Sequence, residues 1–319
     1  MKRWTRSLTS FVPLIVLVMA GAAHAEPASI VFLNGKPTAV FFNDGDSFRV
    51  LQGNMTGMKA RLAGYNTLES YGPVHQWGPW TEHELFVTAK MATLNARRGV
   101  WHCTSDMKTD TYGRTLWWCP DLAADQVKKG LAHVLTVTDA PGEPALITAM
   151  NEAKAAKVGI WSKGIPDWIV TSLHSIEEDV EGHGTYNRMV STLDGHSSKW
   201  QHDEAYKECA KVCDDGGEDG PRIKVAIAAL KAEPALAGAW AQERAYTPAE
   251  LTLIVNDFAR GKAFAQRLRK GDDAGAFAKV LQRLKDEGKF GRVVTLPTCM
   301  THVPFNRRFG GARAACLNK

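Results

Sequence analysis

The chain has 319 residues, of which 45% are hydrophobic and 23% are charged. This composition excludes a disordered chain and suffices for about two domains, each with its own hydrophobic core. The formal net charge of +5 is unevenly distributed. Residues 26–180 hold 14 Lys and Arg against 17 Asp and Glu, a net charge of −3, whereas residues 260–319 hold 14 against 4, a net charge of +10. The basic surplus therefore lies near the C-terminus.

The N-terminus has the pattern of a secretory signal peptide. The opening MKRWTR is basic, an apolar run begins at Phe11, and AHA at residues 23–25 has the small-x-small form of a cleavage site. We predict a signal peptide over residues 1–25 and a secreted or periplasmic mature protein. The apolar run is short for a bilayer span, so we predict no stable membrane insertion after cleavage. Retention of the run as an anchor is the alternative.

Short apolar or alternating runs separated by turn residues predict a β-meander from Ser29 to about Tyr65. They are SIVFL, TAVFF, SFRVLQ and MKARLAGY. A Thr-x-x-Glu capping box at residues 81–84 then opens a predicted helix that ends near Ala96. A second strand pair, GVWHC and RTLWWC, and two further helices, AADQVKKGLAHV and ALITAMNEAKAAK, follow. We predict one strand-rich unit over residues 26–165.

The composition changes beyond Trp161. We predict a polar connector over residues 166–200 and a helical, disulfide-linked C-terminal domain with a basic tail over residues 201–319. A second capping box, TPAE, lies at residues 247–250. The basic stretches KAFAQRLRK and KVLQRLK are either nucleic-acid-binding helices or the solvated faces of amphipathic helices, and we favour the nucleic-acid contact.

The chain has 6 cysteines, and an even number in an oxidising compartment indicates disulfides. Cys103 and Cys119 lie symmetrically about the Thr111-Tyr112 turn, so we expect them to form a cross-strand bridge.

The other cysteines are Cys209, Cys213, Cys299 and Cys316. Because the first two lie four residues apart, we place them on one helix face with bridges to the last two, and the pairing stays open. The alternative is a zinc site made by Cys209 and Cys213 with His196 and His202; an oxidising compartment favours disulfides over such a site.

Three further segments carry the candidate chemistry. Asn43-Asp44-Gly45-Asp46-Ser47 lies between two predicted strands, Asn66-Thr67-Leu68-Glu69 follows the strand that contains Arg61, and Thr111-Tyr112-Gly113-Arg114 lies on the second strand pair. A lone DGD is usually only a turn. Carboxylates at neighbouring strand ends are the oxygen ligands that Ca²⁺ prefers, and paired arginines grip a phosphate through several hydrogen bonds.

The order DGDS, KARLAGYNTLE, TYGR, KKGLA and AKAAKVGIW resembles the staphylococcal nuclease (thermonuclease) family over about residues 30–162. The resemblance implies an α+β fold: an OB-type five-stranded β-barrel with three helices, here followed by a mainly helical second domain.

The resemblance also implies a role for each matching residue. Asp46 would be a direct Ca²⁺ ligand supported by Asp44, Thr67 would offer its backbone carbonyl, and Glu69 would handle the attacking water. Arg61 and Arg114 would hold the phosphate and stabilise the charge of the transition state. Tyr112 would contact a nucleotide phosphate. Members of the family cleave DNA or RNA to leave 3′-phosphate ends.

The chain departs from the family at three positions. In the metal loop, Asn66 replaces a second metal-binding aspartate and Leu68 replaces a proline. Outside that loop, Thr111 stands where the family can carry a lysine near the nucleotide. Asn66 still offers a carbonyl oxygen as a ligand but removes one negative charge, so we expect weaker metal binding. The net charge of −3 on residues 26–180 also weakens attraction to nucleic acid.

The loop between the metal loop and the first helix contains His75, Trp77, Trp80 and His83. These rings either contact the substrate by stacking on bases or pack the loop onto the barrel, and we favour packing. His75 and Trp77 are the candidate substrate contacts.

The sequence therefore predicts an exported Ca²⁺-dependent nuclease, a hydrolase that cleaves phosphodiester bonds of DNA or RNA. The alternative is a catalytically impaired barrel that serves as a nucleic-acid or protein binding module. In that case the C-terminal domain engages a protein partner at the cell envelope.

Overall fold

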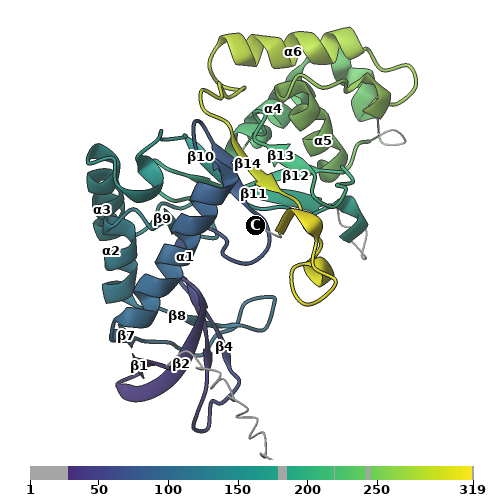
Figure 1. The fold of residues 1–319 in the computed structure, drawn as a ribbon. Helices are drawn as coiled ribbons and strands as arrows, with labels where there is room; N and C mark the ends of the chain where they lie inside the picture. The colour runs from purple at the N-terminus through teal and green to yellow at the C-terminus, as the bar shows by residue number, and fades with distance from the viewer. Residues whose placement is uncertain (1–27, 179–184, 219, 242–244, 318–319) are drawn as a thin grey trace, which may run out of the picture.

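The computed structural model describes residues 28–178, 185–218, 220–241 and 245–317. The predicted signal peptide lies outside these residues. The described part combines a curled β-sheet with helices, which confirms the α+β prediction (Figure 1). Within it, no helix has both the length and the apolar character needed to cross a membrane.

The N-terminal sheet has six strands in the order β7-β1-β2-β3-β4-β8. Their bounds are β1 Ser29–Leu33, β2 Lys36–Asp44, β3 Ser47–Val50, β4 Lys59–Leu62, β7 Trp101–Cys103 and β8 Thr115–Trp117. Neighbours from β1 to β4 are antiparallel, as a meander requires, whereas β7 and β8 add in parallel at the two edges. A separate antiparallel pair joins β5, Gly64–Thr67, to β9, Ala132–Leu135.

The two edges of the curled sheet meet at one seam. Thr104, just after β7, and Trp118, just after β8, exchange both backbone hydrogen bonds, with N···O distances of 2.9 and 2.8 Å. The Cys103–Cys119 disulfide lies beside this bridge and confirms the predicted pairing. The disulfide therefore ties the sheet into a barrel-like shape.

Three helices pack against the sheet and share one hydrophobic core with it (Figure 1). They are α1 Glu82–Arg98, α2 Pro120–Lys128 and α3 Pro144–Ala155. The predicted capping box at the start of α1 is present, since Thr81 and Glu84 exchange side chain to backbone hydrogen bonds. The second helix, predicted to continue through KKGLAHV, instead ends at Lys128. Gly130 adopts φ +63°, a left-handed conformation that stops a helix, and the chain continues as β9.

The segment predicted as a connector contains most of a second sheet. Its strands are β10 Trp168–Ser172, β11 Thr185–Ser191 and β12 Ser197–His202, in the order β10-β11-β12. Trp200 and Met189 are buried beneath it. The polar composition concealed these strands because exposed or half-exposed polar residues, such as Arg188, Lys199 and Gln201, alternate with the buried ones.

A third sheet joins the C-terminal part of the chain to the barrel. Its strands are β13 Lys211–Cys213, β14 Thr298–Thr301 and β6 His75–Trp77, with β14 in the centre and both pairings antiparallel. Disulfides join Cys209 to Cys316 and Cys213 to Cys299. The prediction that Cys209 and Cys213 share a helix face is wrong, because Cys213 lies on β13 and Cys209 adopts φ +64° just before it.

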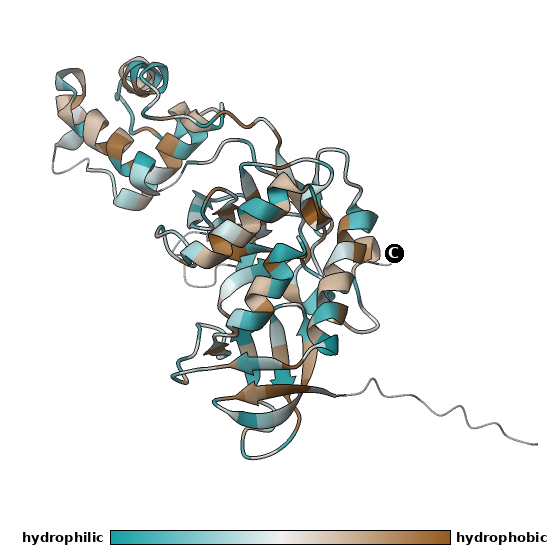
Figure 2. Cartoon of the chain, turned by 90° about the vertical axis from the view of Figure 1, so that its left-hand side faces the viewer, coloured by the Kyte–Doolittle hydropathy of each residue, from teal (hydrophilic) through white to brown (hydrophobic). Residues whose placement is uncertain are grey.

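The helices of the C-terminal part form a group of their own at the top of the molecule (Figures 1 and 2). They are α4 Gly220–Ala232, α5 Pro248–Ala259 and α6 Ala274–Asp286, with 3₁₀ turns at Pro234–Trp240 and Ala265–Arg267. The group has a separate core around Phe277, Ile254 and Leu230. The predicted TPAE capping box begins α5. Hydrophobic and hydrophilic residues alternate along these helices, as amphipathic packing requires (Figure 2).

The basic stretch KAFAQRLRK is not an α-helix and its charges are used within the protein. Arg267 forms ion pairs with Asp203 and Asp257, and Lys262 forms one with Glu204. These pairs hold the segment against the loop that follows β12, so the expected nucleic-acid contact is not supported there.

Candidate active site

The turn between β2 and β3 places two carboxylates beside β5. A Cβ on Gly45 would lie 2.5 Å from Thr67 Cγ2 and 2.9 Å from Ala92 Cβ, so only glycine lets the turn lie against both β5 and α1. The Gly45 carbonyl also accepts a hydrogen bond from the Tyr65 hydroxyl at 2.8 Å. The DGD segment is therefore a packed element as well as a turn, which holds Asp44 and Asp46 in place.

Asp46 is buried, and both of its carboxylate oxygens have protein partners. Oδ1 forms an ion pair with Arg61 Nη1, and Oδ2 accepts a hydrogen bond from the backbone N–H of Thr67 at 2.8 Å. Arg61 lies on β4 and Thr67 ends β5. The structure thus brings together three residues that the sequence pointed to, from the β2–β3 turn and from strands β4 and β5.

Asn66 makes hydrogen bonds that use both of its polar atoms. Its Oδ1 accepts from Arg61 Nη2 at 2.6 Å, and its Nδ2 donates to the Thr67 carbonyl at 2.8 Å. Both oxygens are predicted metal ligands, and each accepts one hydrogen bond from the protein in this structure. Because a carbonyl oxygen has two lone pairs, each keeps one that could face a cation. Their role as ligands stays a prediction.

His133 on β9 fixes the orientation of this amide. Its Nδ1 lies 3.0 Å from the Val134 carbonyl oxygen and therefore carries the proton, which leaves Nε2 to accept from Asn66 Nδ2 at 3.3 Å. Burial lowers the pKa of His133 to about 4, so the ring stays neutral. The sequence reading missed His133 because it placed the residue in a helix, although Gly130 signalled the helix end.

Glu69 interacts electrostatically with several charged residues in this region. Burial, followed by the negative charge of Asp46, raises the pKa of Glu69 to about 7. Three cations act in the opposite direction: Arg308, Arg61 and Arg114. A carboxyl group with this pKa exchanges its proton near neutral pH, as a general base for water must.

Asp44 also interacts with other negative charges. Its pKa is raised well above the ordinary value by burial and then by the carboxylates of Asp46 and Glu69. Ser47 Oγ donates a hydrogen bond to Asp44 Oδ1 at 2.6 Å, which opposes the shift. Together Asp44, Asp46 and Glu69 form a group of carboxylates with more negative charge than Arg61 alone balances.

The second predicted arginine is held by its own turn. Arg114 Nε and Nη2 each lie 2.7 Å from Asp110 Oδ2, and the side chain of Arg114 is 35% exposed. The Tyr112 ring is 69% exposed and lies 5.4 Å from the Arg114 guanidinium carbon. Arg114 and Tyr112 thus face solvent together, as a pair of phosphate and nucleotide contacts requires.

The two rings proposed as substrate contacts between β5 and α1 are not accessible. His75 and Trp77 are 2% and 1% exposed, because β6 is covered by α1 on one side and paired with β14. We therefore remove both from the candidate site. Trp80 is also buried and donates to the Ile160 carbonyl at 3.2 Å, so this residue packs the loop, as the favoured interpretation had it.

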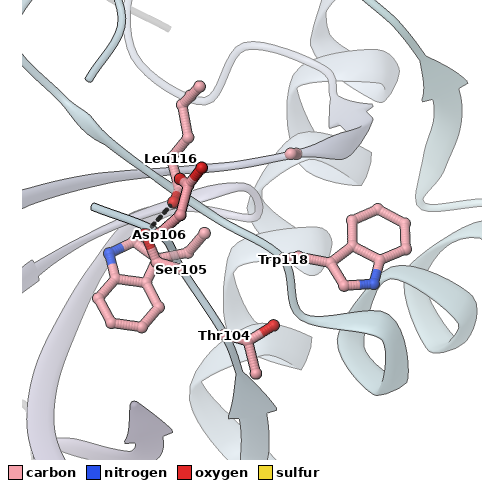
Figure 3. A pocket seen from close by; sticks show the side chains of 7 residues that line it. Thr104, Ser105, Asp106, Leu116 and Trp118 are labelled. Atoms are coloured by element: carbon pink, nitrogen blue, oxygen red, sulfur yellow. Dashed lines mark hydrogen bonds between the residues drawn. The ribbon is translucent and has the colours of Figure 1, made fainter. Parts of the chain in front are cut away.

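A shallow pocket elsewhere on the barrel does not contain these groups (Figure 3). It lies between β8 and the segment after β7, where Ser105 Oγ donates to the Leu116 carbonyl at 2.6 Å. Its one carboxylate, Asp106, is paired with Lys108. Neither the carboxylate group nor the arginines line this pocket, so we place the site at the β2–β3 turn.

Part of the chain matches a known protein family. Residues 59–163 match the family model described as Staphylococcal nuclease homologue. This part of the chain is a staphylococcal nuclease homologue domain. The match to the nuclease domain begins at β4 and includes Arg61, Glu69 and Arg114, whereas the turn with Asp44 and Asp46 precedes it. No curated protein matches the chain.

The donors of this site fit Ca²⁺ in kind. Asp44, Asp46 and Glu69 offer hard oxygen ligands. Burial, followed by the negative charge of Asp46, raises the pKa values of Asp44 and Glu69, and a bound cation would relieve the second of these effects. In the described part of the chain, however, no three or more His, Cys, Asp or Glu side chains are arranged to hold a metal. The alternative zinc site would have no thiolate ligands, because Cys209 and Cys213 both form disulfides.

Proposed function

We propose that the protein is an exported, Ca²⁺-dependent nuclease that hydrolyses phosphodiester bonds of DNA or RNA. The observation that carries this proposal is the electrostatic environment of Glu69. Its carboxyl group has a pKa near neutrality and lies within reach of the charges of Asp46, Arg61 and Arg114. A general base beside a set of arginines is the arrangement that attack of water on a phosphodiester requires.

Each residue has a distinct task in this proposal. Glu69 takes the proton of the attacking water. Arg61, which is held rigidly by Asp46 and Asn66, and Arg114, which is held by Asp110, bind the phosphate through their remaining N–H groups and stabilise the growing negative charge. Asp46, supported by Asp44 and Glu69, would hold the cation. When bound, Ca²⁺ would add positive charge beside the phosphate.

The test is cleavage of labelled single- and double-stranded DNA and RNA, with Ca²⁺ titrated against EDTA. Glu69→Gln removes the base with almost no change in shape, so we expect kcat to fall by a factor of about 10² or more. The matched control is Glu152→Gln, because Glu152 is exposed on α3 and lies outside the site. Equal activity of Glu69→Gln and the wild type would overturn the proposal.

The alternative function rests on Asn66. Because the Asn66 amide donates to the Thr67 carbonyl, the site could bind nucleic acid or a protein without catalysis. Clean wild-type protein that cuts no substrate at any Ca²⁺ level would favour this binding module, with an envelope protein as a candidate partner of the C-terminal part. Export is supported by three disulfides, which form in oxidising compartments.

A further inference from the structure

The last described segment of the chain, residues 302–317, forms a loop that is tied down at both ends. We call it the C-terminal loop. At its start, the backbone of His302 exchanges hydrogen bonds with Cys209 and Ala210, at 2.9 and 2.7 Å. At its end, Cys316 forms the disulfide with Cys209. Both ends are therefore fixed at one place beside β13, which limits how far the loop can move.

The C-terminal loop lies against the loop that carries Glu69. A Cβ added to Gly72 would lie 3.0 Å from Arg308 Cδ and 3.5 Å from its Nε. The rings of Tyr71 and Phe309 are 6.0 Å apart. Figure 1 shows the same neighbourhood: the yellow segment after β14 runs down beside the blue loop that leads into α1. Residues 71–72 and residues 308–309, which are far apart in the sequence, thus lie next to each other.

The charge of this loop is positive throughout. Residues 302–317 include three arginines and no Asp or Glu. The neighbours Arg307 and Arg308 differ in how they are used: Arg307 pairs with Glu208, at 2.7 Å from Nε to Oε2, whereas Arg308 donates from Nε to the Val303 carbonyl. Within the described residues no carboxylate lies in ion-pair distance of the Arg308 guanidinium. Its charge instead acts on Glu69.

The C-terminal loop also exposes aromatic rings. Phe305 and Phe309 are 74% and 54% exposed, and their ring centroids are 6.4 Å apart. Large exposed rings beside arginines are the features with which proteins bind single-stranded nucleic acid, since the arginines contact phosphates and the rings stack on unpaired bases. Paired bases in a duplex offer no such free faces.

We propose that the C-terminal loop is a wall of the substrate site that binds single-stranded nucleic acid, with Arg308 on a phosphate and Phe305 and Phe309 stacked on bases. The proposal rests on the proposed nuclease function, because it makes this loop continue the path that begins at Arg61 and Arg114. It assigns the basic C-terminus a place that the stretch KAFAQRLRK, whose charges pair within the protein, does not provide.

Binding of a short fluorescein-labelled oligothymidine in EDTA tests the proposal without cleavage. We expect Arg308→Ala to raise the Kd about tenfold and to reduce the slope of log K against log salt by about 0.7, the value for one phosphate contact on a single strand. Arg308→Lys should restore much of the affinity. The matched control is Arg307→Ala, because this neighbour is engaged by Glu208.

The aromatic part is tested with the same oligonucleotide and with a duplex. Phe305→Ala and Phe309→Ala should each weaken single-strand binding at least about fivefold and duplex binding much less. Val293→Ala, at a residue 81% exposed outside the loop, is the control. An unchanged thermal midpoint shows that each variant remains folded.

Two outcomes separate this proposal from the nuclease proposal. If the wild type cleaves with Ca²⁺ but Arg308→Ala and Arg307→Ala bind and cleave alike, the C-terminal loop is not part of the site. If the wild type binds the oligonucleotide through Arg308 and the two phenylalanines but never cleaves, the loop proposal holds and the nuclease proposal fails. Equal loss of single-strand and duplex affinity in the phenylalanine variants would also overturn stacking.

Discussion

At the scale of single residues, the Asn66 amide is the part of the site that differs most from its family. Asn66→Asp replaces a donor by a second acidic oxygen beside Asp46, so we expect the half-saturating Ca²⁺ concentration to fall about tenfold, or ~1.4 kcal/mol. The new carboxylate would also face the lone pair of His133 Nε2, which favours a protonated ring. Ca²⁺ titration of the cleavage rate measures the first effect.

Asn54→Asp is the control for this substitution. Asn54 is exposed in the turn between β3 and β4, so the change adds the same charge away from the cation site. A similar fall in half-saturating Ca²⁺ in both variants would mean that net charge, and not residue 66, governs metal affinity.

At the scale of elements, the barrel depends on the seam where β7 and β8 meet. The Cys103–Cys119 disulfide closes this seam across 16 residues of sequence. Cys103→Ser with Cys119→Ser should lower the free energy of unfolding by about 3 kcal/mol, because the unfolded chain regains the freedom that this closure removes. Urea unfolding followed by tryptophan fluorescence measures the loss.

Removal of a different disulfide provides the comparison. Cys209→Ser with Cys316→Ser should release the C-terminal loop but leave the amides of β1–β4 as slow to exchange as in the wild type. The seam variant should speed their exchange. If both variants affected the barrel amides equally, the seam would have no special role in the sheet.

The same elements show what the sequence could and could not predict. The β-meander, the three covering helices, both capping boxes and the Cys103–Cys119 bridge follow from local patterns, and the structure confirms them. The strands β6 and β14 span three and four residues, too few for any periodicity to show. These strands form because each pairs with a strand that is distant in sequence. The contact between the two parts of the chain therefore could not be predicted from local sequence patterns.

Site residues divide in the same way. Asp46, Arg61 and Glu69 lie on one ordered run of strands and turns, and their motif order pointed to them. Arg308 is distant in sequence and reaches the site only because β14 pairs with β6 and a disulfide ties the C-terminal loop. The net charge of the C-terminus pointed to this region, but composition could not say which of its arginines acts on Glu69.

At the scale of the whole molecule, β6 is the strand that joins the barrel to the C-terminal part, and it buries His75. Burial, followed by the charge of His133, lowers the pKa of His75 to about 3. An unfolded chain would protonate this ring near pH 6.5. The folded state therefore binds the proton less well, so the contribution of His75 to stability is complete above about pH 6.5 and is lost as pH falls toward 3.

We therefore expect acid to weaken the join between the two parts of the molecule. Between pH 6.5 and pH 5 the contribution of His75 to the free energy of unfolding should fall by about 1.6 kcal/mol, because the slope grows from half of ~1.36 kcal/mol per pH unit at pH 6.5 to nearly all of it at pH 5. Glu69 acts in the opposite sense, because its pKa of about 7 makes its contribution to the free energy of unfolding grow as pH falls below that value.

The variant His75→Leu separates the two effects, since it removes only the contribution of the histidine. The urea midpoints measured at pH 6.5 and pH 5 should therefore differ less in His75→Leu than in the wild type. The control is His83→Leu, at an exposed position on α1, which should keep the wild-type difference. An unchanged pH dependence in His75→Leu would show that protonation of this strand does not control how the two parts hold together.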